Sequence, residues 1–117
     1  MPGWLAAAME ETVAAARSGA LALQMWTQDR STRQLVNVQL TDARDEVTKA
    51  CQGIAELRAE DPTDVRRQAM LTASMTTIIG DLNAPSAAVR GLPDQPDPRE
   101  LHRRLLDGAD ALQRDYR

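Results

Sequence analysis

The stretch VNVQLTDARDEVTKACQGIAEL, residues 36–57, decides the fold. Its apolar positions are Val36, Leu40, Ala43, Val47, Ala50, Ile54 and Leu57. They recur at alternating intervals of four and three residues, which places them along one side of an α-helix. A half-buried strand would instead alternate at every second residue. The pattern therefore predicts an amphipathic helix, at residues 33–60, that packs against other helices.

The flanking segments show the same period and predict three further helices, at about residues 4–28, 62–82 and 98–116. The first is rich in alanine and has Gly19 near its middle, which costs about 1 kcal/mol of helix stability relative to alanine. A close approach by a neighbouring helix is one reason to tolerate that glycine. Residues 27–32 contain neither Gly nor Pro, so one continuous helix through them also fits the sequence. We favour a tight turn, because a single helix of that length could not bury its apolar seam in a small domain.

Two Asp-Pro pairs mark the starts of the last two helices. Asp61 and Asp97 are each followed by proline, which suits the first helical position because its missing N–H has no partner there. Glu100 lies three residues after Asp97 and predicts a capping box. The segment between these helices, residues 83–97, contains three prolines and a glycine. It is predicted to be a long loop, which is uncommon in a compact domain unless the loop has a function.

These elements predict an all-α fold, an antiparallel up-down four-helix bundle with a long Pro-rich loop before the last helix. The length of 117 residues fits a single helical domain, residues 1–117. At 1.5 Å per residue, the first two helices would be roughly 37 and 42 Å long and the last two roughly 30 and 28 Å. The first pair is therefore expected to overhang the second at its connecting turn. The overhanging residues would include Met25, Trp26, Leu35 and Val36.

Composition excludes several classes of protein. No apolar run approaches the roughly 20 residues of a membrane-spanning helix, and one cysteine cannot form a disulfide scaffold. No basic segment precedes the first apolar run, which Glu10 and Glu11 interrupt, so we expect no signal peptide and a cytoplasmic location. Of the 14 basic residues only Lys49 is a lysine, a bias that, with the alanine excess, suggests a GC-rich bacterial genome.

No motif for catalysis or metal binding is evident. Asp42, Asp45 and Glu46 have a spacing that can hold Mg²⁺ in helical enzymes, but their helical phase points away from the apolar seam and no matching motif occurs on another helix. His102 is the one histidine and Cys51 the one cysteine, and neither has a catalytic partner at a suitable spacing. The sequence therefore predicts no enzyme, no cofactor and no metal.

Two binding alternatives remain open. Arg30, Arg33, Arg66 and Arg67 could contact nucleic acid, although the net charge is −3 and aromatic residues for base stacking are scarce. An apolar ligand pocket could also form among methionines, although methionine often merely fills gaps in a core. The residues considered for that pocket are Met9, Met25, Met70, Met75 and Trp26.

The preferred hypothesis is a non-enzymatic helical-bundle protein that acts through protein–protein interaction, as a dimerisation or docking module. Its partner is another protein or a second copy, with a homodimer favoured and no membrane involved. Tryptophan and arginine together are typical of interface hot spots, whereas the simpler interpretation of Trp26 is a core residue at the bundle end. The predicted partner-binding residues are Met25, Trp26, Arg30, Arg33, Leu35 and Val36, beside the loop of residues 83–97. The alternatives are a small nucleic-acid-associated regulator that uses exposed arginines and a bundle that binds an apolar small ligand.

Overall fold

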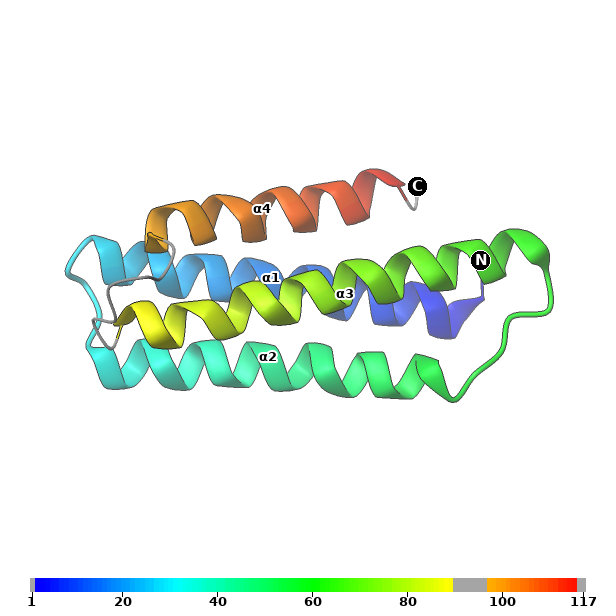
Figure 1. The fold of residues 1–117 in the computed structure, drawn as a ribbon, viewed down its shortest axis with the longest axis horizontal. Coiled ribbons are helices and arrows are strands. Elements are labelled where there is room, and N and C mark those ends of the chain that lie inside the picture. The colour runs from blue at the N-terminus through cyan, green and yellow to red at the C-terminus, as the bar shows by residue number, and fades with distance from the viewer. Residues whose placement is uncertain (1, 90–96, 116–117) are drawn as a thin grey trace.

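The structure is a computed structural model that describes residues 2–89 and 97–115, with residues 84–89 and 115 described by their backbone. It contains helices α1 (Gly3–Thr27), α2 (Arg33–Ala55), α3 (Pro62–Val89) and α4 (Pro98–Asp115). The helices run side by side in alternating directions along an axis of 47 Å (Figure 1). The all-α, antiparallel four-helix bundle predicted from the apolar spacing is thereby confirmed.

The four helices form a closed ring in which α1 is the most enclosed member. α1 contacts α2 on one side and α4 on the other, and α3 completes the ring by contacting both of these helices. α1 and α3 also meet across the ring, whereas α2 and α4 have no contact among the described residues. The cross-section is therefore a flattened diamond whose short diagonal joins α1 and α3.

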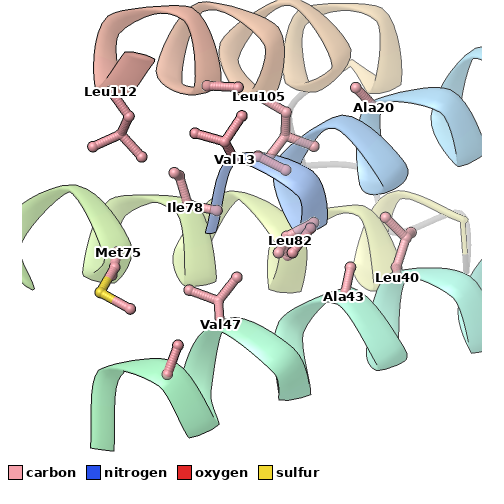
Figure 2. Packing of buried hydrophobic residues seen from close by; sticks show 14 of the residues in the cluster. Val13, Ala20, Leu40, Ala43, Val47, Met75, Ile78, Leu82, Leu105 and Leu112 are labelled. Atoms are coloured by element: carbon pink, nitrogen blue, oxygen red, sulfur yellow. The ribbon is translucent and has the colours of Figure 1, made fainter. Parts of the chain in front are cut away.

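The core is aliphatic, as the absence of phenylalanine requires. Each seam position of α2 from Val36 to Ile54 is buried, while Leu57 lies beyond the helix and is exposed. Side chains of all four helices converge in Figure 2, with Val13 of α1, Val47 of α2, Ile78 of α3 and Leu105 of α4 among them. This convergence explains the sequence pattern, because burial of one apolar stripe from each helix is the main source of stability.

Gly19 lies where the four helices come closest together. A Cβ atom added there would overlap with Cδ2 of Leu82 in α3, and would lie 3.5 Å from Leu105 of α4 and 3.7 Å from Leu40 of α2. Each of these leucines is almost completely buried. The glycine therefore allows the close approach of α1 and α3 across the bundle, as its position in the first helix suggested.

The link between α1 and α2 is a tight turn rather than a continuous helix. Asp29 adopts φ 56°, a left-handed conformation. Its N–H donates to the Trp26 carbonyl, and the next N–H, of Arg30, donates to the Met25 carbonyl, which is the Schellman arrangement of a helix end. Thr32 then begins α2, and its hydroxyl accepts a hydrogen bond of 3.1 Å from the N–H of Leu35. Asp29 and Thr32 thus supply the stop and start signals.

Helix α2 ends at Ala55, so the predicted end at residue 60 is wrong. The side chain of Gln68 in α3 donates to the carbonyls of Ile54 and Leu57 at 2.7 and 2.8 Å. The Ile54 carbonyl belongs to the last turn of α2 and also accepts from the N–H of Leu57, whereas Leu57 follows the helix. Gln68 thus ties the end of α2 and the residues just after it to α3, a contact that the apolar period does not contain.

Helix α3 runs to Val89, so the predicted end at residue 82 and the predicted start of the loop at residue 83 are wrong. Leu82 is buried, and Asn83 accepts a hydrogen bond from Arg44 of α2, so this turn is held in place although Pro85 follows. The added turns extend α3 toward the α1–α2 turn (Figure 1), and they remove most of the predicted overhang. Residues 90–96 of the predicted loop lie outside the described residues.

The two predicted Asp-Pro helix starts are confirmed. Asp61 accepts a hydrogen bond from the N–H of Thr63 at 2.7 Å, and Asp97 accepts one from the N–H of Arg99 at 2.8 Å. The Asp97 half of the expected capping box is present. Glu100, expected to supply the other half, has a carboxylate that accepts a hydrogen bond from Arg104. These caps set the points at which α3 and α4 enter the bundle.

The close packing at Gly19 predicts that Gly19→Ala lowers the free energy of unfolding by about 1 kcal/mol. Overpacking of a core costs about 1–3 kcal/mol, and the better helix propensity of alanine offsets about 1 kcal/mol of that cost. Gly53→Ala is the matched control, because a Cβ added there has nothing within 4 Å, and it should raise the free energy of unfolding by about 1 kcal/mol. Urea unfolding followed by circular dichroism measures both. An equal gain in stability for the two variants would contradict the close approach.

The left-handed conformation of Asp29 predicts that Asp29→Gly stabilises the protein, by up to about 1 kcal/mol, because glycine adopts this conformation without strain. Gln28→Gly is the control: Gln28 has φ −94°, where glycine only adds freedom to the unfolded chain, and this variant should be destabilised. Thermal unfolding distinguishes the two. A loss of stability in Asp29→Gly would show that this turn is not used in solution.

Candidate interaction surface

The predicted partner-binding residues lie around the α1–α2 turn, but they do not share one surface. Arg30, Arg33 and Leu35 are exposed, and Met25 is partly buried near the end of α1. Val36 is 0 % exposed and belongs to the core, because it shares the helical phase of Leu40 one turn later. It is therefore not available to a partner of the folded chain, and the predicted set has to be corrected at this position.

Trp26 packs at the end of the core, as the simpler interpretation expects, and its role as an interface anchor stays a prediction. Its side chain is partly buried and packs against the core cluster. Within α1 it is seven residues from Gly19, so it has nearly the same helical phase as the inner side of that helix. Trp26 therefore closes the end of the core rather than standing on the outer side of α1.

Three large apolar side chains are exposed close to this end of the bundle. Leu21 of α1 is 56 % exposed, and Leu35 and Val38 of α2 are 47 % and 52 % exposed. Leu21 borders a hollow of about 300 Å³ between the two helices, whose other lining residues are Ser18, Ala22, Gln39, Asp42, Ala43 and Glu46. Leu35 and Val38 lie one turn before Gln39 and Asp42, and side chains at this spacing are neighbours on a helix. We refer to Leu21, Leu35, Val38 and this hollow together as the α1–α2 surface.

Sequence reasoning missed Leu21 and Val38, although a signal for Leu21 was present. Ala7, Ala14 and Leu21 repeat at intervals of seven residues. Each directly follows another apolar residue of the first helix. All three are exposed, so they form a second apolar stripe along the outer side of α1. Such a stripe is not needed for the core of a monomer and is typical of a helix that also meets something else.

The charges around the α1–α2 surface are distributed unevenly. Arg30 and Arg33 are exposed at the turn, whereas Asp42 and Glu46 are exposed further along α2 and border the hollow. None of these four side chains forms an ion pair with another residue that the structure describes. Acidic Asp29 beside Arg30 and basic Lys49 near Glu46 are exposed as well, so both signs of charge occur toward each end of the surface.

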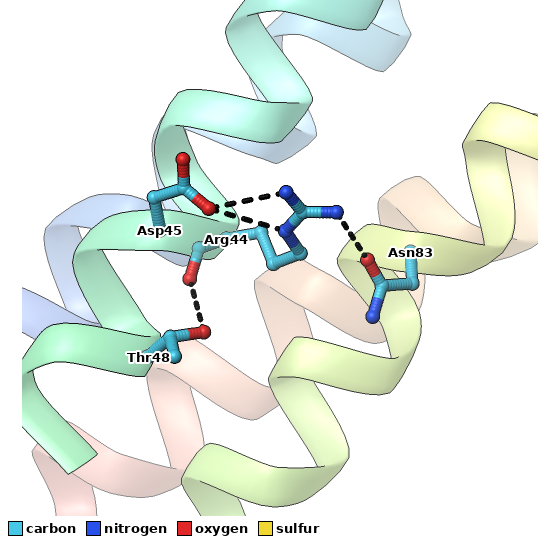
Figure 3. Close-up of polar contacts among 4 residues, drawn as sticks. All are labelled: Arg44, Asp45, Thr48 and Asn83. Carbon is cyan, nitrogen blue, oxygen red and sulfur yellow. Dashed lines mark hydrogen bonds and ion pairs between the residues drawn. The ribbon is translucent and has the colours of Figure 1, made fainter. Parts of the chain in front are cut away.

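The acidic residues of α2 form a solvated face, as their helical phase predicted. Asp42, Asp45 and Glu46 are all exposed. Asp45 accepts hydrogen bonds from its neighbour Arg44, which reaches on to Asn83 of α3 (Figure 3). Within residues 2–89 and 97–115 no group of three or more Asp, Glu, His or Cys side chains is arranged to hold a metal ion.

The remaining candidates for chemistry are dispersed. His102 lies partly buried in the first half of α4, and Cys51, also partly buried, packs against the core from α2. The methionines considered for a ligand pocket do not converge, because Met75 is fully buried in the core whereas Met70 is 53 % exposed on α3. Four hollows on the described part of the chain, including the one beside Leu21, are lined by other residues and by none of these methionines.

The four arginines considered for nucleic-acid binding lie at two different ends of the bundle. Arg30 and Arg33 are at the α1–α2 turn, and Arg66 and Arg67 belong to the first turns of α3. Figure 1 shows that the start of α3 lies at the end opposite to that turn. Arg67 is moreover paired with Asp64 at 3.4 Å. The four residues therefore make no continuous basic patch.

Comparison of the chain with protein-family models, with curated proteins and with solved structures finds no match. None of the described helices combines the length and the apolar character needed to cross a lipid bilayer. The candidate surface therefore has to be judged on its own geometry and charge.

One carboxyl group has a shifted pKa, and it lies away from the α1–α2 surface. Burial raises the pKa of Asp81 in α3 above its ordinary value, and the guanidinium of Arg104, 3.8 Å away on α4, opposes this rise. Arg104 also forms an ion pair with Glu100, so its guanidinium links two carboxyl groups, one on α3 and one on α4. This arrangement is a structural contact between helices.

The raised pKa of Asp81 predicts how stability depends on pH. The folded state binds the Asp81 proton more tightly than the unfolded chain does. The free energy of unfolding therefore rises as the pH falls through the folded-state pKa of Asp81, and this gain is complete below pH 3.8, the ordinary pKa of the group. Asp81→Asn should therefore be at least as stable as the wild type at pH 7, with the difference shrinking toward acid. Arg104→Gln removes the opposing charge and should steepen the dependence. Urea unfolding across pH tests both, and a wild-type advantage at pH 7 that is lost on acidification would reverse the assignment.

Proposed function

We propose that this chain is a non-enzymatic helical-bundle protein that works by protein–protein contact through its α1–α2 surface. The observation that carries the proposal is the exposure of Leu21, which borders the hollow, and of Leu35 and Val38, one turn before two of its lining residues, at the same end of the bundle where the sequence favoured a contact. Exposed apolar side chains that gather around a concave area mark interaction sites more often than scattered ones do. The surface is therefore the best candidate for the contact of this bundle with a partner in a bacterial cytoplasm.

The form of the α1–α2 surface suits recognition of another helix. Its floor consists of small side chains, Ala22 and Ala43, and its edges carry the larger Leu21 and the polar Gln39 and Glu46. Small residues at the floor let the backbone of a partner helix approach, and apolar anchors then fill the groove. A second hollow continues along the same two helices, between Ala8 of α1 and Ile54 of α2. The groove can thus accommodate an extended contact.

The two alternatives receive less support. Nucleic-acid binding by exposed arginines would have to use Arg30 and Arg33 alone, because Arg66 and Arg67 lie at the far end. Binding of an apolar small ligand among the methionines is disfavoured because Met75 is buried in the core whereas Met70 is exposed on the outside of α3. Retention on duplex or single-stranded DNA that weakens steeply with salt would favour the nucleic-acid alternative.

Purification of the tagged protein from its native host tests the proposal. The double variant Leu21→Ser/Val38→Ser removes apolar contact area without touching the core, and Met70→Ser is its control because Met70 is 53 % exposed on another helix. We expect the wild type and the control to elute with a stoichiometric partner, either another protein or a second copy, and the double variant to lose it by at least tenfold. Equal elution of the same proteins by all three, or of none with any of them, would contradict the proposal.

A further inference from the structure

Two hollows follow one another between α1 and α2, and both are bordered by exposed side chains. The two helices run side by side in opposite directions, so the first part of α1 is level with the last part of α2 (Figure 1). The hollow at that end is bordered by Trp4 and Leu57, and the hollow nearer the α1–α2 turn is bordered by Leu21. At 1.5 Å per residue, the distance from Trp4 to Leu21 along α1 is roughly 26 Å. We refer to the two hollows together as the α1–α2 groove.

The α1–α2 groove has a floor of small side chains and an apolar residue at each end. The floor is lined by four buried alanines, Ala8, Ala22, Ala43 and Ala50. Leu57 is 43 % exposed at one end, and Leu21 is the exposed apolar residue at the other. A floor of this kind lets the backbone of a partner helix come close, while apolar side chains of the partner pack at the two ends.

The charged residues that line the α1–α2 groove have an excess of negative charge. Asp42 and Glu46 border the hollow nearer the turn. Glu11 and Lys49 border the other hollow, and no further charged residue of the described chain lines either one. All four side chains are exposed, and none forms an ion pair with another described residue. Lys49 can compensate only one of the three carboxylates, so the lining stays negative.

The pair of Asp42 and Glu46 carries a cost that a basic partner removes. The two residues lie four positions apart on α2, where side chains are neighbours, and like charges at this spacing destabilise a helix. A guanidinium or ammonium group placed between them by a partner replaces repulsion with attraction. Complementary charge of this kind steers a partner to its site and rejects partners of the wrong sign. The lining therefore favours a cationic partner.

A second copy of the same groove does not supply this positive charge. Two copies docked groove to groove about a two-fold axis double the excess of carboxylates over amines between them. Like charges brought together in an interface disfavour that contact. The homodimer favoured by the sequence is therefore not expected to form by pairing of this groove with itself.

From these features we infer that the occupant of the α1–α2 groove is an amphipathic helix of a different protein, with apolar and small residues on one face and Arg or Lys on its flanks. This inference rests on the proposed function and specifies the chemistry of the partner. Apolar residues of that helix pack on Trp4 and Leu57 at one end and on Leu21 at the other. Basic side chains between these anchors pair with Asp42 and Glu46. A helix of about 18 residues spans the groove.

Binding of designed peptides tests the charge and the helical face together. The first probe is a helical peptide of about 18 residues without aromatic residues, with a face of leucine and alanine flanked by lysines. The second has glutamate in place of each lysine, and the third has the composition of the first in scrambled order. Fluorescence of the protein reports binding, because Trp4 borders the groove.

We expect the lysine peptide to bind at least about tenfold more tightly than either of the other two at low ionic strength, and salt to weaken its binding. Equal binding of the lysine peptide and its scrambled form would overturn the amphipathic helix. Tighter binding of the glutamate peptide, or no binding of the lysine peptide, would overturn the inferred charge.

Neutral variants test whether the groove itself recognises the lysines. Asp42→Asn/Glu46→Gln removes two carboxylates from the lining and should weaken binding of the lysine peptide about tenfold. Glu60→Gln/Asp107→Asn is the matched control, because it changes the net charge equally at two exposed residues that do not line the groove, and it should bind as the wild type does. Equal weakening in the two variants would reduce the effect to net charge and overturn the inference.

Purification from the native host separates this inference from the proposed function. The expected result is that Leu21→Ser/Val38→Ser and Asp42→Asn/Glu46→Gln both lose the same partner, a different protein that binds through a segment with an apolar face and basic flanks. If only Leu21→Ser/Val38→Ser loses its partner, or if the partner lost is a second copy, contact through the α1–α2 surface stands and the basic helix is overturned. If neither variant changes what elutes, both proposals fail.

Discussion

The bundle depends on the absence of one side chain, at Gly19. A Cβ there would overlap with the terminal methyl Cδ2 of Leu82, so the glycine leaves room for this side chain of α3 against α1, the pair of helices that meets across the bundle. α2 and α4 are thereby held apart on opposite sides of this pair. α1 becomes the central element that contacts every other helix, which accounts for its many alanines: small side chains are needed on several faces of a helix that is packed on three sides.

The regular parts of the fold could be predicted because their signals are local. The spacing of apolar residues in α2 identifies both the helix and its buried face, and Asp61 and Asp97 cap the helices that they precede. The two helix ends that were missed involve other parts of the chain. Gln68 ties the end of α2 to a different helix, and the contact of Arg44 with Asn83 holds α3 where Pro85 would suggest an end. No local pattern contains these contacts.

The proposed interaction surface lies at the end of the bundle for which the sequence predicted a contact, but it shares only some of the predicted residues. Leu35 and Arg30 are exposed, as their place at the turn suggested, whereas Val36 continues the seam of Leu40 into the core. The helical phase places Leu21 and Val38 away from the buried seams, but how these exposed side chains lie relative to the hollow depends on the packing of α1 against α2, which no local pattern contains. The position of the arginines at two ends follows from the predicted up-down order, because the helix after α2 begins at the end opposite to the α1–α2 turn.

The two tryptophans occupy opposite ends of α1, one near its first turn and one near its last, and both pack against the core from a partly buried position. The remaining core is aliphatic, so it contributes no intrinsic emission of its own. Fluorescence from Trp4 therefore reports on the end where α2 leads into α3, and fluorescence from Trp26 on the end beside the α1–α2 turn. The bundle thus carries a separate optical probe at each end, by which fraying of one end can be told from global loss of helix.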